Sequence, residues 1–356
     1  MKILFLIPYP IYESPSQRFR FEQYFSLLTL NGISYSVQSF LTKKGWRSIF
    51  QSDNILRKAT AMIIGLMRRM VVLAQIPAFD FVFIHREVCP FGPPVFEWII
   101  AHIFRKKIIY DFDDAIWATD KKDEGQLEKI IRWRSKIKNI CRWSYKVSCG
   151  NDYLCSYASK YNRHVILNPT TIDTRLHTTD NHKKQNTNKI TIGWTGSHST
   201  LKYLREIVPV IQTLELKYPQ LQFLVIANQK PVLDLRSLVF LPWSVTSEIE
   251  DLIKIDIGIM PLPDDEWSKG KCGFKILQYM ALEIPALASP VGVNNKIIDN
   301  ENNGFLCGTQ QEWLFNIEQL INNDQLRLAM GMQGRSFIER HYSVSSNSAN
   351  FLSLFA

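Results

Sequence analysis

The sequence predicts an α/β fold made of two doubly wound domains. Short apolar runs rich in β-branched and aromatic residues alternate with longer helical patterns, which is typical of parallel sheets built from βαβ units. The alternation stops at a polar stretch, residues 178–188, and then begins again. Because 356 residues are also more than one compact core usually holds, we expect two domains.

The apolar runs give the expected strands in order. In the first half these are residues 2–7, 79–84, 107–110, 145–149 and 164–167. In the second half they are residues 190–194, 222–227, 239–241, 256–260 and 286–288. We expect one domain over residues 1–170, a linker over 171–189 and a second domain over 190–335. Residues 336–356 complete a helical tail whose end is apolar enough to pack on another part of the chain.

The net charge of +9 is unevenly distributed along the chain. Residues 1–168 hold 25 Lys and Arg against 14 Asp and Glu, whereas residues 169–356 hold 17 against 19, so the two parts carry +11 and −2. This asymmetry indicates that the first half meets an anionic partner, either nucleic acid, a membrane surface or a phosphorylated substrate. A basic face without a partner is the alternative.

Two basic helical stretches in the first half, residues 54–76 and 129–146, interleave Lys and Arg with apolar and aromatic side chains. Helices of this composition can lie on anionic lipid, and the alternative is that both are ordinary core helices with solvated faces. We predict peripheral association of this domain with an anionic membrane surface. No nucleic-acid-binding motif is recognisable, so we expect no nucleic-acid partner.

The cysteines and the apolar runs bear on cellular location. The six cysteines include no C-x-x-C pair, which favours a reducing compartment, and no His or Cys cluster has the spacing of metal ligands, so we expect no metal. The apolar run that precedes Pro8 is too short for a signal peptide. The stretch 59–67 is far shorter than the ~20 residues of a spanning helix. We therefore expect a cytoplasmic protein that associates with the inner face of the cell membrane.

The passage from strand 190–194 into the following helix has the features of a phosphate site. Its glycines allow the backbone to approach a ligand, and its hydroxyl residues are expected to cap a helix that begins near Leu201, whose N–H groups attract phosphate. Two glycines before a helix also occur in ordinary tight turns, which is the alternative. The candidate ligand contacts are Gly193, Thr195, Gly196, Ser197 and Lys202.

A second passage, residues 267–281, predicts a site for the same anion. In a helix, Lys271, Lys275 and Gln278 lie on one face, and two cations at a helix start repel each other unless an anion binds there. The loop after strand 256–260 and the turn 288–292 are expected at the same edge of the sheet. Three loops at one edge favour a nucleoside diphosphate as ligand. The candidates are Pro261, Lys271, Gly273, Phe274, Lys275 and Gln278.

Polar residues also follow three strands of the first domain. Ligands of doubly wound sheets bind beyond the carboxyl ends of the strands, so these side chains are expected to face a ligand. Clustered carboxylates there are costly unless they bind a cation, pair with Arg or Lys, or contact sugar hydroxyls. Capping of the loops by the same carboxylates is the alternative. The residues are Arg18, Arg20, His85, Arg86, Glu87, Asp111, Asp113 and Asp114.

At residues 111–117, 192–197, 274–281 and 288–292 the sequence resembles the retaining glycosyltransferases of family 4, which have the GT-B fold. The resemblance extends over essentially the whole chain. It implies two Rossmann-like domains that face each other across a cleft, with a nucleotide-sugar donor bound by the C-terminal domain and a glycan or lipid-linked acceptor bound by the N-terminal domain. It also implies that a final helix within 336–356 crosses back to the N-terminal domain.

The sequence departs from the family pattern at two glutamates that the family places eight positions apart. Gly270 and Gln278 stand at these positions here. In the family the second glutamate holds the ribose of the nucleotide, and the amide of Gln278 can still hydrogen-bond ribose hydroxyls. Gly270 has no side chain with which to contact the sugar.

The charged groups of the family pattern depart as well. Lys202 matches one member of the basic pair that binds the donor diphosphate, whereas Trp194 and Thr195 replace the usual arginine. Lys275 or Lys271 is expected to supply the missing charge. A histidine of the N-terminal domain is replaced by the aspartates around residue 113.

The reaction that the resemblance implies is retaining transfer of a sugar from a nucleotide diphosphate sugar to an acceptor hydroxyl, without a cofactor, in the synthesis of cell-envelope polysaccharide or glycolipid. Lys202 and Lys275, with backbone amides near Gly196, would stabilise the departing diphosphate. Asp113 and Asp114 would orient acceptor or donor hydroxyls. The departing phosphate itself would help to accept the proton of the acceptor.

Two other enzyme classes share parts of these features. A nucleotide-sugar epimerase has the same GT-B architecture and would bind the same donor, but it needs no acceptor. A Rossmann dehydrogenase is disfavoured, because no G-x-G-x-x-G follows the first strand.

Overall fold

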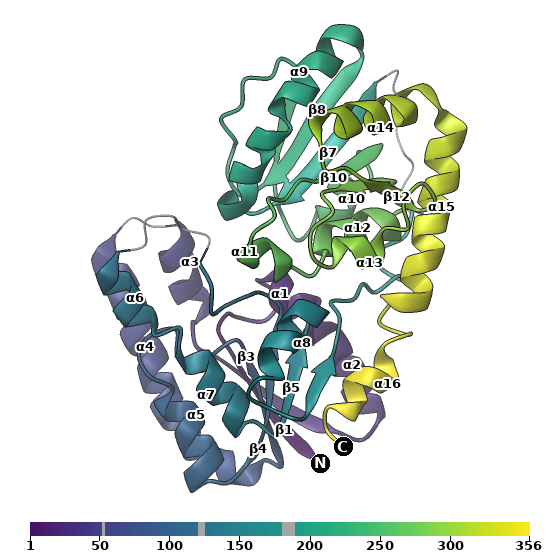
Figure 1. The fold of residues 1–356 in the computed structure, drawn as a ribbon. Helices are drawn as coiled ribbons and strands as arrows, with labels where there is room; N and C mark the ends of the chain where they lie inside the picture. Colours follow the sequence, from purple (N-terminus) through teal and green to yellow (C-terminus); the bar gives the residue numbers. More distant parts are fainter. Residues whose placement is uncertain (52–53, 120–124, 180–188) are drawn as a thin grey trace. The chain divides into compact units, whose positions relative to one another are not determined.

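The computed structural model describes residues 1–51, 54–119, 125–179 and 189–356. The chain divides into two compact units. Unit 1 contains residues 1–170, 270–272 and 347–356, and unit 2 contains residues 171–269 and 273–346. Over the described residues, each unit is built around one six-stranded parallel sheet (Figure 1).

The sheet of unit 1 has the strand order β2-β1-β3-β4-β5-β6. The inner strands are buried because helices cover both faces of the sheet, as is usual for parallel sheets. The order reverses between β1 and β3, which pair through Ile3 and Phe81. The strands are β1 (Lys2–Ile7), β2 (Ser34–Ser39), β3 (Phe81–His85), β4 (Lys107–Phe112), β5 (Lys146–Cys149) and β6 (Val165–Leu167).

The helices of unit 1 pack on two faces of this sheet. Leu4, Leu6 and their neighbours on β3 and β4 share a core with residues of α4, α7 and α8, whereas Phe5 on the other face contacts Phe25 of α2 and Phe355. The helices are α1 (Pro15–Arg18), η1 (Glu22–Tyr24), α2 (Phe25–Leu30), α3 (Lys43–Gln51), α4 (Ile55–Leu73), η2 (Ile76–Ala78), α5 (Val95–Trp98), η3 (Ile99–Ile103), α6 (Gln126–Arg132), α7 (Lys136–Trp143), α8 (Asp152–Ala158) and α16 (Ser348–Ser353).

Unit 2 repeats the plan with the strand order β12-β11-β10-β7-β8-β9. Its core includes Ile192 and Phe223 from the sheet and Ile317 from a covering helix. The strands are β7 (Ile190–Gly196), β8 (Leu221–Ala227), β9 (Leu238–Pro242), β10 (Ile257–Met260), β11 (Ala286–Ala288) and β12 (Gly304–Leu306). The helices are η4 (His198–Glu206), α9 (Val208–Lys217), α10 (Glu248–Leu252), α11 (Glu266–Lys269), α12 (Phe274–Ala281), α13 (Asn294–Ile297), α14 (Gln310–Asn322) and α15 (Asp324–His341).

The structure contains two strands, β2 and β12, that the sequence did not predict. β2 reads Ser-Tyr-Ser-Val-Gln-Ser and lies at the edge of its sheet, so it carries no apolar run. β12 has three residues and also lies at an edge. Edge strands are partly solvated and short, which removes the apolar signal by which inner strands are recognised.

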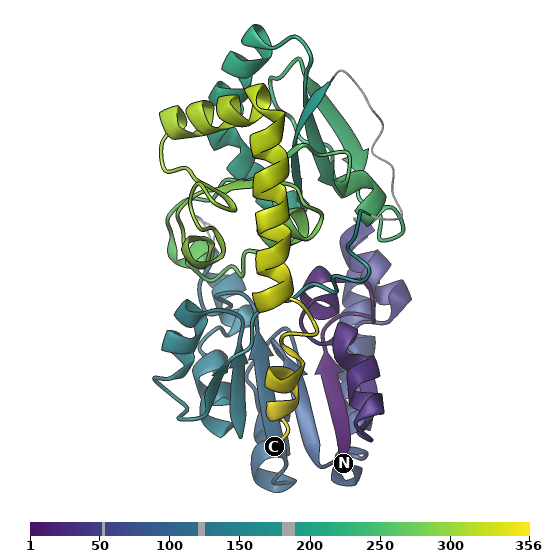
Figure 2. The ribbon, with the colours of Figure 1, turned by 90° about the vertical axis from the view of Figure 1, so that its right-hand side faces the viewer.

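The end of the chain returns to unit 1. α15 belongs to unit 2, and residues 347–356 belong to unit 1, so the segment expected to return, 336–356, is divided between the units. Phe351 stacks on Tyr24 with ring centroids 4.3 Å apart, and the Lys146 ammonium donates to Ser353 O at 2.6 Å. Figure 2 shows α16 lying over the strands of unit 1.

The expected linker, 171–189, falls partly outside the described residues, which omit 180–188. Residues 171–179 belong to unit 2, where Ile172 pairs with Ser343. In the part of the chain that the structure describes, no helix is both long and apolar enough to span a bilayer.

Candidate functional site

The carboxyl ends of β7 and β10 lie at the sheet edge where a ligand of unit 2 is expected. These strands are neighbours, with Gly193 beside Gly258, but the chain leaves β7 toward β8 and reaches β11 on the other side of β10. Doubly wound sheets bind ligands where the strand order reverses in this way. The structure places the predicted residues Thr195 and Gly196 at the end of β7, Ser197 directly after it, and Pro261 directly after β10.

Lys275 lies beside Gly196 at this edge. Its ammonium is 5.3 Å from the centre of the buried Trp194 ring, a cation–π distance. A Cβ added to Gly196 would lie 2.5 Å from the Trp194 ring and 3.0 Å from Lys275 Cε, so glycine is needed for this close approach. The structure therefore brings one predicted cation beside Gly196, the last residue of β7. Gly193 has a different role. A Cβ there would lie 2.3 Å from the Ile255 side chain, so glycine at this position allows Ile255 to pack against the strand.

Tyr279 of α12 holds the ends of the two strands and was not predicted as a site residue. Its hydroxyl accepts from Thr195 N at 3.1 Å and donates to Ile259 O at 3.4 Å. The side chain is fully buried, and burial raises the pKa of its phenol. Gly258 leaves space for the ring, because a Cβ there would be 2.4 Å from it. In the sequence only its place four residues after Lys275 could have indicated this role.

The expected helix start near Leu201 is wrong. A 3₁₀-helix, η4, begins at His198, and the side chain of Ser197 does not cap it. The Ser197 hydroxyl instead lies 2.8 Å from that of Ser199, and His198 N donates to Asn228 Oδ1 at 2.8 Å. Local hydroxyl bonds thus compete with helix capping here. Lys202 is exposed on η4.

The expectation that Lys271, Lys275 and Gln278 share one helix face is also wrong for Lys271. α12 begins at Phe274 because Gly273 has φ +67°, and a Cβ at Gly273 would lie 2.3 Å from the Ile297 side chain. Lys271 precedes this break and belongs to unit 1.

Gln278 is buried rather than presented on the polar face. Its amide Nε2 lies 3.4 Å from Glu248 Oε1. The same carboxylate oxygen accepts from Trp243 Nε1 at 3.2 Å. Glu248, at the start of α10, is a polar contact that the motif search missed, because it lies 30 residues before Gln278 in no recognisable pattern.

The predicted residues Arg20, His85 and Asp111 meet in the interior of unit 1. All three are at most 1% exposed. The Arg20 guanidinium pairs with Asp111, whose carboxylate also accepts from Ser148 Oγ at 2.6 Å and lies 2.8 Å from His85 Nδ1. Burial raises the pKa of Asp111, but the Arg20 charge and the His85 hydrogen bond outweigh it and hold the pKa well below its usual range. His85 ends β3 and Asp111 lies near the end of β4, so this buried network supports the carboxyl ends of these two strands.

Arg86, Asp113 and Asp114 form a partly exposed layer next to this network. Arg86 lies directly after β3 with φ +62°, a left-handed conformation that is rare for arginine. Its guanidinium donates to Asp113 Oδ1 at 2.8 Å and to Asp114 Oδ2 at 2.6 Å. Strained backbone of this kind persists only where surrounding contacts over-determine it, and it concentrates at functional sites. The two carboxylates are thereby fixed with 12% and 19% of their side chains exposed.

Residues 270–272 complete this layer. The Lys271 ammonium lies 3.5 Å from Asp114 Oδ1, and Asn151 Nδ2 donates to Lys271 O at 2.9 Å. Burial raises the pKa of Asp114, and the charges of Lys271 and Arg86 lower it below the ordinary value. Gly270 packs on Ala115 so closely that a Cβ would lie 2.5 Å from the Ala115 nitrogen.

The remaining predicted residues of the first domain have other contacts. Glu87 Oε2 pairs with the Lys136 ammonium at 2.6 Å, and Lys136 is buried. The Arg18 guanidinium lies 4.8 Å from the centre of the Phe19 ring. Among the described residues, no group of three or more His, Cys, Asp or Glu side chains is arranged to hold a metal ion.

Glu22, near the carboxyl end of β1, supports a prediction about pH. Burial raises the pKa of its carboxyl to about 7, although Tyr12 N and Gln17 Nε2 donate to it. Folded unit 1 therefore keeps a proton that the unfolded chain releases near pH ~4.5, so this group lowers stability as pH rises from about 4.5 to 7. Glu22→Gln is expected to remove this part of the pH dependence of Tm, with Glu13→Gln as control. An unchanged slope would contradict it.

Part of the chain matches a known family. Residues 189–323 match the family model described as Glycosyl transferases group 1. This range runs from β7 to the end of α14 and contains Gly196, Lys275 and Tyr279. A comparison with curated protein sequences finds no match.

Solved structures resemble the whole chain. Sucrose-phosphate synthase from Thermosynechococcus elongatus has a TM-score of 0.73 at 11% identity, over 100% of this chain and 98% of that one. The Anabaena HepE protein in complex with UDP and glucose has a TM-score of 0.66 at 15% identity, over 100% and 99%. A glycosyltransferase from Rickettsia africae has a TM-score of 0.66 at 11% identity, over 99% and 97%. Two six-stranded parallel sheets and the alignment with these structures over nearly the whole chain confirm the predicted fold class, which is that of the GT-B glycosyltransferases.

Proposed function

We propose that this protein is a retaining glycosyltransferase that moves a sugar from a nucleotide diphosphate sugar to an acceptor hydroxyl. The observation that carries the proposal is the match of residues 189–323 to the Glycosyl transferases group 1 model, since that range holds the edge of unit 2 at which we place the donor. HepE of the same fold was crystallised with UDP-glucose, so a uridine diphosphate sugar is the first donor to test.

Unit 2 is the proposed donor-binding unit. β7 ends at Gly196, whose following backbone amides are proposed to contact the diphosphate, and Lys275 lies beside Gly196 over the Trp194 ring. Charge develops on the diphosphate as the sugar leaves. A cation and amides that are already in place stabilise that charge without reorganisation, which is usually a large part of catalysis. Lys202 on η4 adds a second cation to the same proposed role.

Unit 1 is the proposed acceptor-binding unit. Arg86 pairs with both Asp113 and Asp114, and the charges of Lys271 and Arg86 hold the pKa of Asp114 below its ordinary value. The exposed oxygens of these two aspartates are suited to accept hydrogen bonds from sugar hydroxyls. Arg20, His85 and Asp111 are buried, so their proposed role is to position this layer and not to contact the acceptor. A glycan or lipid-linked acceptor of the cell envelope fits the basic charge of this half of the chain.

Lys275→Ala is expected to lower kcat for sugar transfer by about 10²-fold or more, because it removes a cation from the developing charge on the diphosphate. Lys202→Ala is expected to act in the same direction with a smaller effect, since Lys202 is exposed. The measurement is transfer from UDP-glucose and related donors to glycan acceptors. Lys254→Ala, at the amino end of β10, is the control and should keep full activity. Undiminished turnover in Lys275→Ala would contradict the assignment.

Two further measurements separate this function from its alternatives. A nucleotide diphosphate that binds only the folded state raises Tm, so a thermal-shift series over nucleotides identifies the donor base. Incubation with donor alone then distinguishes transfer from epimerisation, because an epimerase converts the nucleotide sugar without an acceptor. The match of residues 189–323 to the Glycosyl transferases group 1 model favours transfer over epimerisation. The anomeric configuration of the product tests retention.

A further inference from the structure

Helix α4 presents an apolar face to solvent along its whole length. Leu56, Ile63, Met67, Met70 and Val71 are between 60% and 74% exposed. At 100° per residue these side chains fall on one side of the helix, and the 19 residues extend over about 28 Å. Scattered exposed apolar residues are ordinary, but a continuous stripe of this length marks an interaction surface.

The orientation of α4 is fixed by its opposite face. Gly65 packs on Phe40, and a Cβ there would lie 2.4 Å from the ring. The buried guanidinium of Arg69 donates to three backbone carbonyls, those of Ile7, Gln38 and Val88, at 2.7 to 2.8 Å. Rotation of the helix to hide its apolar face would break all three hydrogen bonds and bury a positive charge without partners. The apolar stripe is therefore held outward by the fold.

A groove lies beside the stripe. It has a volume of about 300 Å³ and is lined by residues of α4, by Gln75 shortly after it, and by Gln38 of β2, the edge strand of the sheet. Met67 and Val71 belong to both the groove and the stripe, and Arg68 lies at the groove. The surface thus combines an apolar ridge, an apolar recess and a cation.

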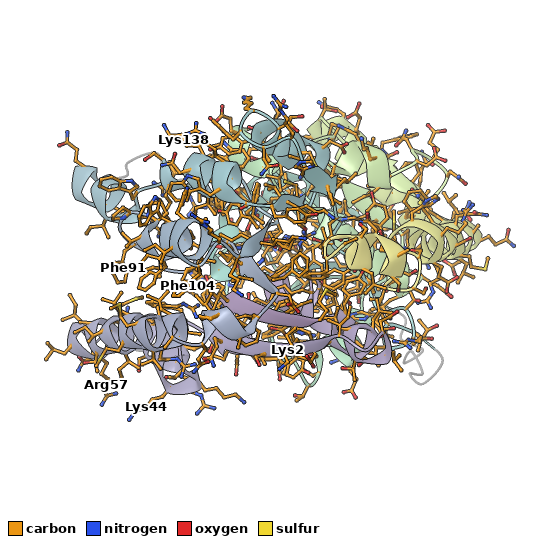
Figure 3. All side chains as sticks on the ribbon, turned by 90° about the horizontal axis from the view of Figure 1, so that it is seen from below. Lys2, Lys44, Arg57, Phe91, Phe104 and Lys138 are labelled. Carbon is orange, nitrogen blue, oxygen red and sulfur yellow. The ribbon has the colours of Figure 1, made fainter. Side chains whose placement is uncertain are left out.

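Positive charge borders the stripe. α3 and α4 contain no Asp or Glu. Asp53, between them in the sequence, lies outside the described residues. Figure 3 shows Lys44 and Arg57 on the same side of unit 1, next to α4. Apart from the buried Arg69, the basic residues of these two helices are Lys43, Lys44 and Arg47 of α3 and Arg57, Lys58 and Arg68 of α4.

We propose that the outward face of α4 docks unit 1 on a bilayer that contains anionic lipids. An apolar helix face bordered by Lys and Arg is the structure that lies in the interface of such a bilayer, with its apolar side chains among the acyl chains and its cations at the headgroups. A second copy of the chain fits less well, because two such faces related by a two-fold axis bring basic borders together. The proposal does not rest on glycosyl transfer.

The test is co-sedimentation of the full chain with vesicles of phosphatidylcholine alone and with phosphatidylglycerol added. Binding is expected to the mixed vesicles and to weaken as salt rises. Ile63→Asp with Met67→Asp is expected to lower the partition coefficient by about tenfold or more, because two inserted side chains become charged. Leu328→Asp with Met332→Asp, exposed apolar residues at the same spacing on α15, is the matched control and should bind like the wild type.

A charge variant separates the two contributions. Lys44→Gln with Arg57→Gln is expected to weaken binding to the mixed vesicles and to reduce the salt dependence. Far-UV circular dichroism and Tm confirm that each variant is folded, which is expected because the substituted side chains are largely on the surface. Equal binding of the wild type and the Ile63→Asp, Met67→Asp variant would overturn the proposal. Vesicle-free dimerisation that this variant abolishes would overturn it as well, since the face would then belong to a second copy.

Discussion

Asp111→Ala is expected to lower the free energy of unfolding of unit 1 by about 3–5 kcal/mol, the largest stability effect that we predict. The carboxylate is fully buried and is the partner of both the Arg20 guanidinium and the His85 ring. Without it, a buried positive charge loses its counter-ion, and Ser148 Oγ loses an acceptor. Urea unfolding followed by circular dichroism gives the change in free energy.

The same carboxylate has a defined pH dependence. Its pKa is lower in the folded chain than in the unfolded chain, where it is near ~3.9, because the Arg20 charge outweighs burial. Its contribution to stability is therefore complete above about pH 4 and is lost as pH falls through the folded pKa. The difference in stability between the wild type and Asp111→Ala should be constant near neutral pH and should shrink in acid.

Asp264→Ala is the control for Asp111→Ala. Asp264 pairs with Lys269 at 3.0 Å, but its side chain is 69% exposed. A solvated pair of this kind contributes roughly 0–1 kcal/mol, so the control should unfold almost like the wild type. Similar unfolding free energies for both variants would show that the buried network does not stabilise unit 1.

Gly270→Ala is expected to reduce kcat/KM for sugar transfer by about 10²-fold, if the protein has the proposed activity. The new methyl group would lie 2.5 Å from Ala115 N and 2.6 Å from Ala115 Cβ, so the backbone of 270–272 must move. That movement separates Lys271 from Asp114 and displaces the carboxylates proposed to orient the acceptor. The same overlap is expected to lower stability by about 1–3 kcal/mol.

Gly125→Ala is the matched control, because a Cβ at Gly125 would meet no atom within 4 Å. It should retain both activity and Tm. Donor binding, measured by thermal shift with a nucleotide diphosphate, should survive in Gly270→Ala, because the proposed donor contacts lie in unit 2. Full transfer activity in Gly270→Ala would contradict the role given to this segment.

The parts of the fold that were predicted correctly are those that have a local signal. β1, β3, β4, β7 and β8 are buried runs, and an apolar run is visible without knowing its neighbours. β2 was missed because its six residues are mostly polar and become a strand only by pairing with β1. Tertiary pairing overrode a weak local preference there.

The residues of the candidate site also differ in whether a local sequence pattern indicates them. Gly196 at the end of β7 and Asp113 and Asp114 after β4 could be placed at sheet edges from the sequence, because small and acidic residues at a strand end are a local pattern, and their functional roles stay predictions. The helix expected from residue 271 was wrong, since Gly273 takes a left-handed conformation against Ile297. Tyr279 was assigned to no function, although its hydroxyl joins two strand ends.

The alternation of strands and helices, and the sheet edges at which polar residues gather, follow from the sequence alone. These features depend on residues only a few positions apart, whose periodicity can be recognised in the sequence. Which charges are buried together, why residue 270 must be glycine, and which face of α4 remains exposed depend on residues far apart in the sequence. Only the tertiary structure decides these, because burial and counter-ion contact arise when distant segments pack. The basic residues of the first half therefore differ in role: Arg20 is buried with Asp111, Arg86 pairs with two aspartates, and the cations of α3 and α4 leave an unbalanced positive charge.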